Sequence, residues 1–147
     1  MIGEMTPSQI DHLIKSQPYG RVCCGSPERL YVVPLSFVYE EPYLYAHSKE
    51  GTKIRIMRTN KKVCFQVDQI SNMGNWWSVM LWGDFEELFD PDLKNHAKEL
   101  INDRLEPLVA SQALEGPVRP GVVEKGTQPI LFRIKVLEKS GRFEKTR

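Results

Sequence analysis

The chain has 147 residues, of which 41% are hydrophobic and 27% charged, and its formal net charge is +1. These values predict one globular domain over residues 1–147, in a size range where domains often pair with a second copy. The nearly neutral charge gives no reason to expect nucleic acid or a membrane as a partner. No stretch approaches the roughly 20 apolar residues that span a bilayer. The N-terminus also lacks the apolar run of a signal peptide, so we expect a cytoplasmic protein.

The sequence contains three cysteines, Cys23, Cys24 and Cys64, with no CxxC or metal-ligand spacing. They can be interpreted as a metal or redox thiol pair, or as small apolar residues that fill strands. The second interpretation is favoured because free cysteines are commonly buried. No disulfide framework is implied, which suits a reducing cytosol.

The first expected element is a short helix that begins at residues 6–9. Thr6 suits the N-cap, Pro7 suits the first helical position, and Gln9 closes a capping box. Apolar residues then recur at helical spacing, and the segment ends near Pro18.

Strand patterns dominate the rest of the chain. The strand-forming residues fall in six segments: 20–25, 29–39, 43–48, 61–69, 76–89 and 130–138. The fourth segment alternates, with Val63, Phe65 and Val67 on one face. Pro34 predicts a bulge or an edge strand, and Gly83 predicts a kink that curves the sheet.

Two further helices are expected at 52–59 and 90–112, and residues 116–129 form a loop rich in proline and glycine. Hairpin-like connections between six strands favour a closed or partly open antiparallel barrel over a parallel sheet. The expected fold class is therefore mainly β, a six-stranded antiparallel barrel with a few short helices.

Charge is distributed unevenly along the chain. Residues 49–62 contain six cations and one carboxylate, a net charge of +5, whereas residues 84–106 contain three cations and eight carboxylates, a net charge of −5. The acidic segment is interpreted as a solvated helix face and strand end.

The basic segment contains a candidate phosphate site at the start of the helix expected at 52–59. A helix N-terminus carries unpaired N–H groups and partial positive charge, so Lys53 in the first turn is unfavourable unless an anion binds there. Gly51 allows a ligand close to the backbone, and Ser48 and Thr52 offer hydroxyl groups. A solvated basic surface is the alternative, and this segment alone does not decide between the two.

The order and spacing of several motifs resemble the pyridoxamine 5′-phosphate oxidase-like superfamily, and most closely its nitroimidazole-reductase-type branch. The matching stretches are VVPLSFVY at 32–39, YLYAHS at 43–48, GTK at 51–53, KVCFQV at 62–67, WSVMLWG at 77–83 and FRI at 132–134. The resemblance covers residues 5 to 140. It implies a Greek-key split β-barrel that forms a homodimer, with FMN in a cleft between the subunits.

The resemblance also assigns roles to individual residues. Four residues are implied along the flavin ring, largely through their backbone groups: Val33, Pro34, Leu35 and Ser36. Four lead towards the phosphate: Tyr45, Ala46, His47 and Ser48. Three hold the phosphate: Gly51, Thr52 and Lys53. Two contact the flavin, often across the dimer: Trp77 and Ser78.

The chain departs from true pyridoxamine phosphate oxidases at two of these places. Their Arg-Lys phosphate pair reads Thr52-Lys53 here, and their Arg-Gln strand pair reads Trp77-Ser78. No counterpart of their C-terminal substrate-binding segment follows Gly141, so oxidation of vitamin B6 is not expected.

A flavin performs the redox chemistry itself, while the protein supplies orientation, charge and a dry face. We therefore expect reduced flavin to pass electrons to a small electron-poor molecule or to oxygen. His47 is the candidate polar contact near the ring or ribityl chain, and a structural hydrogen bond is its alternative. Trp77 is a candidate for stacking, although aromatic strand residues more often fill cores and interfaces.

Three classes of function remain open at this point. The first is an FMN-dependent oxidoreductase, and the second is a flavin- or haem-binding module without turnover. The third is a protein that binds through its basic patch and has no cofactor.

Overall fold

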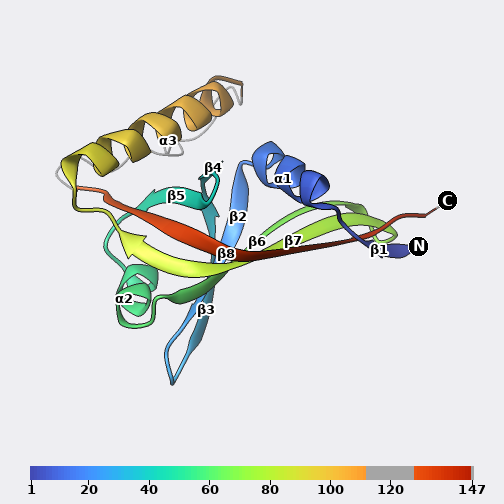
Figure 1. The fold of residues 1–147 in the computed structure, drawn as a ribbon, viewed down its shortest axis with the longest axis horizontal. Coiled ribbons are helices and arrows are strands. Elements are labelled where there is room, and N and C mark those ends of the chain that lie inside the picture. The colour runs from blue at the N-terminus through green and yellow to red at the C-terminus, as the bar shows by residue number, and fades with distance from the viewer. Residues whose placement is uncertain (112–127, 147) are drawn as a thin grey trace.

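The computed structural model describes residues 1–111 and 128–146. In this part of the chain eight strands and three helices follow one another (Figure 1). They are β1 (Ile2–Glu4), α1 (Pro7–Ser16), β2 (Tyr19–Gly25), β3 (Leu30–Ser36), β4 (Val38–Glu40), β5 (Tyr43–Ser48), α2 (Thr52–Thr59), β6 (Lys62–Asn72), β7 (Asn75–Glu87), α3 (Pro91–Ser111) and β8 (Ile130–Glu144). Residue 112 of the expected third helix and residues 116–127 of the expected loop lie outside the described residues.

The strands form one antiparallel sheet with the order β3-β2-β6-β7-β8-β5-β4, and β1 pairs with β8. The sheet does not close, because β3 and β4 remain at its two ends. The mainly β split-barrel class is therefore confirmed, with eight strands instead of the expected six. One extra strand arises because residues 29–39 divide at Phe37 into β3 and β4, and the other is β1.

The inner face of the curved sheet contains the main core. Side chains that alternate along β2, β6 and β7 meet there, including Val22, Phe65 and Val79, which are fully buried. The apolar faces of α1 and α2 pack into the same cluster, with Ile14 and Ile54 at 0% exposure. A second cluster lies where α3 packs on β5. It comprises Tyr45, Leu88, Ala97, Ile101, Leu105 and Leu131.

Helix α1 begins at the capping box that the sequence predicts. The Thr6 hydroxyl accepts a hydrogen bond from the Gln9 backbone at 3.2 Å, and the Gln9 side chain accepts one from the Thr6 backbone at 2.9 Å. This reciprocal pair is the predicted capping box, and it satisfies two N–H groups at the start of the helix.

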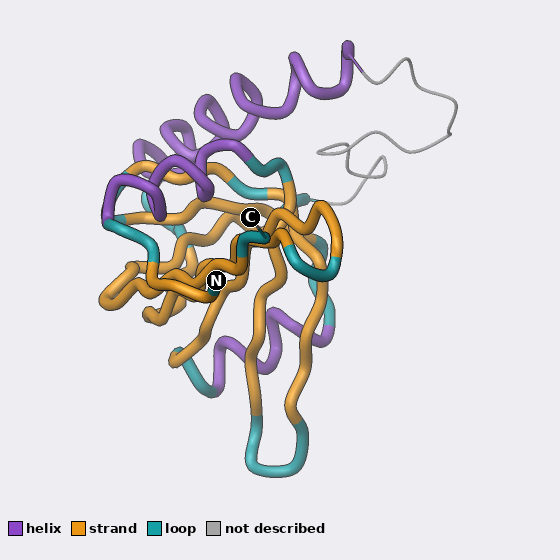
Figure 2. Tube along the Cα trace, turned by 90° about the vertical axis from the view of Figure 1, so that its right-hand side faces the viewer, coloured by secondary structure: helices purple, strands orange, loops and turns teal. Residues whose placement is uncertain are grey.

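Both special positions expected in the strands are also confirmed. Pro34 lies on β3, an edge strand of the sheet, where a missing N–H costs no ladder hydrogen bond. Gly83 lies where the pairing register between β7 and β8 shifts. The β2–β3 hairpin extends away from the body of the molecule, as Figure 2 shows.

The two ends of the chain lie side by side. β1 pairs with the last residues of β8, and the backbones of Met1 and Lys145 exchange two hydrogen bonds of 2.8 Å. The last strand therefore continues to Glu144, beyond the end expected near Glu138. Among the described residues, no helix has the length and apolar character needed to cross a bilayer.

Candidate functional site

The two faces of the sheet separate the residues that the resemblance places along a flavin ring. On β3, Val33 and Leu35 point towards the main core, while Pro34 and Ser36 point to the outer face. A ligand on the outer face can therefore meet the side chains of Pro34 and Ser36, but only the backbone of the other two.

Trp77 and Ser78 on β7 are separated in the same way. The Trp77 ring packs on the core side and stacks on Phe143, with ring centroids 4.7 Å apart and an interplanar angle of 24°. Ser78 faces outward and accepts a hydrogen bond from the Gln66 side chain at 3.0 Å. Ser78 therefore shares a face with Pro34 and Ser36, whereas Trp77 does not.

A polar network on this outer face was missed at the level of the sequence. Arg21 donates to Gln66 and to Asp68, each at 3.2 Å, and Gln66 also donates to Asp68 at 2.8 Å. Cross-strand pairing places Arg21 directly beside Pro34 on β3 and Gln66 on β6. The alternation of β6 indicates which side chains share a face, but the partner residues depend on the register between strands.

The residues of β5 also divide between the two sides of their strand. Ala46 lies in the main core, whereas Tyr45 packs beneath α3, with its ring 5.8 Å from that of His96. His47 alternates with Ala46 and pairs across the sheet with Leu131, a member of the α3 cluster. Of the four residues that the resemblance places on this strand, Ala46 and Ser48 therefore share the side that faces the main core, and Tyr45 and His47 share the other.

Burial lowers the pKa of His47 below its usual value, because the charged ring is disfavoured when it loses water. The fold therefore favours the neutral form of His47. Above about pH 6.5 the ring is neutral in both the folded and the unfolded chain, so burial of its charge costs no stability. As the pH falls through the lowered pKa, the folded chain must accept the buried charge and stability is lost. We expect the free energy of unfolding of a His47→Leu variant to fall less than that of the parent between pH 7.5 and pH 5. Urea denaturation at both pH values measures this, and an identical pH dependence in the two proteins would contradict it.

The first turn of α2 differs from those of the other two helices. Its N-cap is Gly51, which makes no side-chain capping hydrogen bond; like that of α1, the turn contains no acidic residue. In α3, by contrast, Asp90 accepts a hydrogen bond from the Leu93 backbone at 3.1 Å. A Cβ atom added at Gly51 would meet only the Lys49 carbonyl oxygen, at 3.9 Å. Open space therefore surrounds the position of a side chain at Gly51, at the start of this turn.

Lys53 in this turn is half-buried. Burial lowers the pKa of its ammonium group, while the nearby Cys24 thiol acts in the opposite direction. Among residues 1–111 and 128–146, no carboxylate forms an ion pair with Lys53. A partly buried cation is costly unless it is paired, so Lys53, which has no carboxylate partner among the described residues, favours the binding of an anionic ligand.

Arg58, at the other end of α2, is by contrast neutralised. It binds Glu87 through two hydrogen bonds of 2.7 and 3.1 Å and also binds Glu50 at 2.6 Å. The basic and acidic segments of the sequence therefore meet at this point. The interpretation of the acidic segment as a solvated helix face and strand end does not hold for Glu87, whose side chain is 15% exposed, while Glu86 pairs with Arg133 at 2.7 Å and stays 38% exposed.

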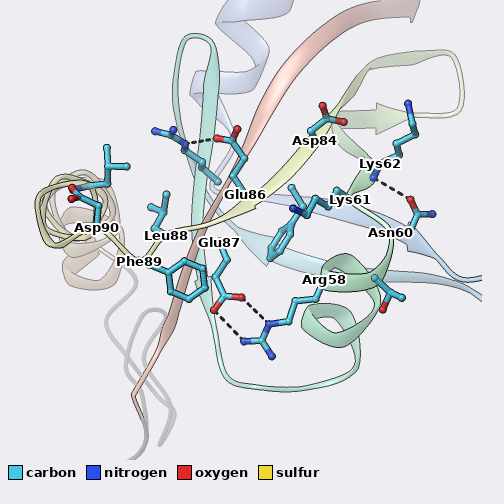
Figure 3. A pocket seen from close by; sticks show the side chains of 14 residues that line it. Arg58, Asn60, Lys61, Lys62, Asp84, Glu86, Glu87, Leu88, Phe89 and Asp90 are labelled. Carbon is cyan, nitrogen blue, oxygen red and sulfur yellow. Dashed lines mark hydrogen bonds and ion pairs between the residues drawn. The ribbon is translucent and has the colours of Figure 1, made fainter.

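These ion pairs line a large cleft of about 1040 Å³ between α2, the end of β7 and the start of α3 (Figure 3). Eight of the fourteen residues that line it are charged, and Phe89, which is 76% exposed, lies at its edge. None of the residues that the resemblance assigns to a flavin lines this cleft. The volume of the cleft is therefore not an argument for placing the cofactor there.

The comparisons with known proteins agree with this architecture. A crystal structure of a FAD-binding protein from Mesorhizobium loti is 27% identical, with a TM-score of 0.76 over 97% of this chain and 98% of that chain. A candidate 5-nitroimidazole antibiotic resistance protein from Bacteroides thetaiotaomicron is 21% identical, with a TM-score of 0.73 over 97% and 87% of the two chains. An uncharacterised protein from Rhizobium meliloti is 29% identical over 84 residues, which span 57% of this chain and 56% of the relative.

The family itself is identified by a match over most of the chain. The model of the pyridoxamine 5′-phosphate oxidase family matches residues 6–143, which include every element from α1 to nearly the end of β8. Together with the split barrel and its open α2 turn, this match shows that the chain belongs to the pyridoxamine 5′-phosphate oxidase family.

Proposed function

We propose that this protein binds a flavin nucleotide and acts as an oxidoreductase. The observation that carries the proposal is the first turn of α2, where half-buried Lys53 lies at an uncapped helix start with no described carboxylate partner. Family membership and the FAD-binding relative from Mesorhizobium loti support the same cofactor class.

The flavin phosphate would be held by this turn. Backbone N–H groups at a helix N-terminus bind anions, and the missing side chain of Gly51 lets the phosphate approach them. Lys53 would add a charge-assisted hydrogen bond, and Thr52 and Ser48 would add hydroxyl donors. The donors available in this chain therefore suit a phosphate ester.

The flavin ring would lie against the outer face of the sheet. Pro34, Ser36 and Ser78 present their side chains on this face, and Arg21 and Gln66 provide polar groups beside them. These residues would bind the ring, fix its orientation and limit its access to water.

A bound flavin supplies two-electron redox chemistry to the site. We propose a small electron-poor acceptor, or oxygen, as the substrate. The 5-nitroimidazole named for the Bacteroides relative is an acceptor of this kind. Thr52 replaces the arginine of the Arg-Lys pair, and Trp77-Ser78 replaces the Arg-Gln pair, of true pyridoxamine phosphate oxidases, which argues against a vitamin B6 substrate.

The experiment that tests the proposal begins with the purified chain. We expect yellow protein that releases FMN or FAD when it is denatured, and chromatography of the released material distinguishes the two. Bound flavin, once reduced, is then mixed with a 5-nitroimidazole or with oxygen, and faster reoxidation than for free flavin supports an oxidoreductase. Colourless protein that binds neither FMN nor FAD when they are added would refute flavin binding. A haem Soret band would favour the haem-binding alternative.

We further propose that the protein forms a homodimer, with the flavin site completed at the subunit interface. The projecting β2–β3 hairpin supports this, because Leu30 and Val32 on it are 81% and 59% exposed. Apolar side chains clustered on a projecting element are typical of protein–protein contacts.

A Leu30→Lys, Val32→Lys double variant tests the role of the hairpin. We expect light scattering after size exclusion to show a dimer for the parent and a monomer for this variant, because two charges cannot be buried without partners. Ile70→Lys is the matched control, since Ile70 is 68% exposed but lies on β6 outside the hairpin. A variant that stays dimeric, or a parent that is monomeric, would contradict the proposed interface.

A further inference from the structure

The fold brings together two cysteines that are 41 positions apart in the sequence. Cys23 on β2 and Cys64 on β6 are direct partners in the antiparallel ladder, so both side chains leave the same, outer face of the sheet. Both residues are half-buried and carry free thiols. Cys24, the neighbour of Cys23, points into the core instead and is 2% exposed.

The two outer thiols belong to directly opposed residues. Cys23 pairs with Cys64 in the antiparallel β2–β6 ladder. Directly opposed residues of an antiparallel pair have Cα atoms about 4.5–5.5 Å apart. A disulfide needs a Cα separation of about 4.4–6.8 Å, and directly opposed residues fall within this range.

A small cavity gives reagents access to this pair. It has a volume of about 280 Å³ and is lined by Cys23, Cys24 and Cys64 together with Leu30, Lys62 and Trp82. Trp82 is the cross-strand neighbour of Cys64 on β7. In a single subunit the two outer thiols therefore line an open pocket that a small molecule can enter, and Leu30 on its wall also belongs to the proposed dimer contact.

We propose that Cys23 and Cys64 form a redox-active dithiol that is converted to a cross-strand disulfide by small disulfides of the glutathione class. The Cys23 thiolate attacks one sulfur of the oxidised reagent, breaks its S–S bond and releases the first thiolate, leaving a mixed disulfide on Cys23. Cys64 then gives up its proton and attacks the Cys23 sulfur, which releases the second reagent thiol. The chain loses two hydrogens and two electrons, and the reagent is reduced to two thiols.

The surroundings of Cys64 suggest the order of attack. Burial, with the adjacent Cys23, raises the pKa of the Cys64 thiol above its usual value, which disfavours the thiolate that attacks. We therefore expect Cys23 to attack first and Cys64 to resolve the mixed disulfide, and the two single-cysteine variants test this order.

The test uses the full chain, folded and reduced, incubated with oxidised glutathione. We expect intact-mass analysis to show the loss of two hydrogen masses, and non-reducing peptide mapping to find Cys23 linked to Cys64. A Cys64→Ser variant is expected to stop at one glutathione on Cys23, because the resolving thiol is absent. In a Cys23→Ser variant, modification is expected to be at least about tenfold slower.

Cys24→Ser is the matched control, since it removes the adjacent thiol that faces the core, and it is expected to behave like the parent. Three free thiols in folded protein after incubation would overturn the proposal. A link through Cys24, or a disulfide that forms only after denaturation, would overturn it as well. The flavin is not needed for any of these readouts, so failure of flavin binding and failure of the dithiol can be told apart.

Discussion

Replacing Lys53 with methionine is expected to weaken flavin binding by about 1.5–3 kcal/mol, a factor of roughly 10 to 150 in Kd. Methionine retains most of the aliphatic stem of lysine but removes the charge that would contact the phosphate. Titration of the flavin-free chain with FMN or FAD, followed by flavin fluorescence, measures the difference.

The same substitution is expected to leave the flavin-free protein at least as stable as the parent. Burial lowers the pKa of Lys53. Below this lowered pKa the folded chain contains a buried charge, which reduces the free energy of unfolding. That loss is recovered as the pH rises from the lowered pKa to the usual value of 10.5. At neutral pH, removal of this charge removes an unfavourable contribution. A residue that costs stability yet improves ligand binding is characteristic of a functional site.

Arg55→Met is the matched control for Lys53→Met. Arg55 is on the same helix and carries the same charge, but it is exposed. We expect its replacement to change the flavin Kd by less than about threefold, because exposed charges are screened by solvent. Equal effects of the two variants would mean that the basic segment attracts the flavin only through its overall positive charge. Unchanged affinity in both variants would mean that the phosphate binds elsewhere.

Local sequence patterns were sufficient for most of the fold. The capping box at Thr6, the alternation that buries Phe65 and the glycine at the β7 bulge all act over a few residues, and each is found where it was expected. β1 was missed because its three residues carry little pattern of their own and pair with the far end of the chain. Such pairing depends on tertiary contacts that no local window contains.

The arrangement of the candidate site required the register between strands. Adjacent residues such as Trp77 and Ser78 look like one motif in the sequence, but they leave opposite faces of β7. In the same way, Arg58 belongs to the basic segment in the sequence, whereas in the fold it is paired with Glu87. The cysteine pair is the clearest case, because only the β2–β6 register brings Cys23 and Cys64 together.

Substitution of Gly83 by alanine is expected to lower the free energy of unfolding by about 3 kcal/mol or more. The register shift beside Gly83 lets the backbone of β8 pass very close to it. A Cβ atom there would press on the Lys135 carbonyl oxygen and would lie 2.9 Å from the Ile134 Cγ2 atom. A backbone oxygen cannot move aside as a flexible side chain can, so the two strands would have to separate.

Gly51→Ala is the control for Gly83→Ala, because its added methyl group enters open space at the start of α2. We expect it to cost less than about 1 kcal/mol in stability while it weakens flavin binding. Urea denaturation of both variants, with flavin titration of each, separates the two effects. Equal losses of stability would mean that β8 does not press on Gly83.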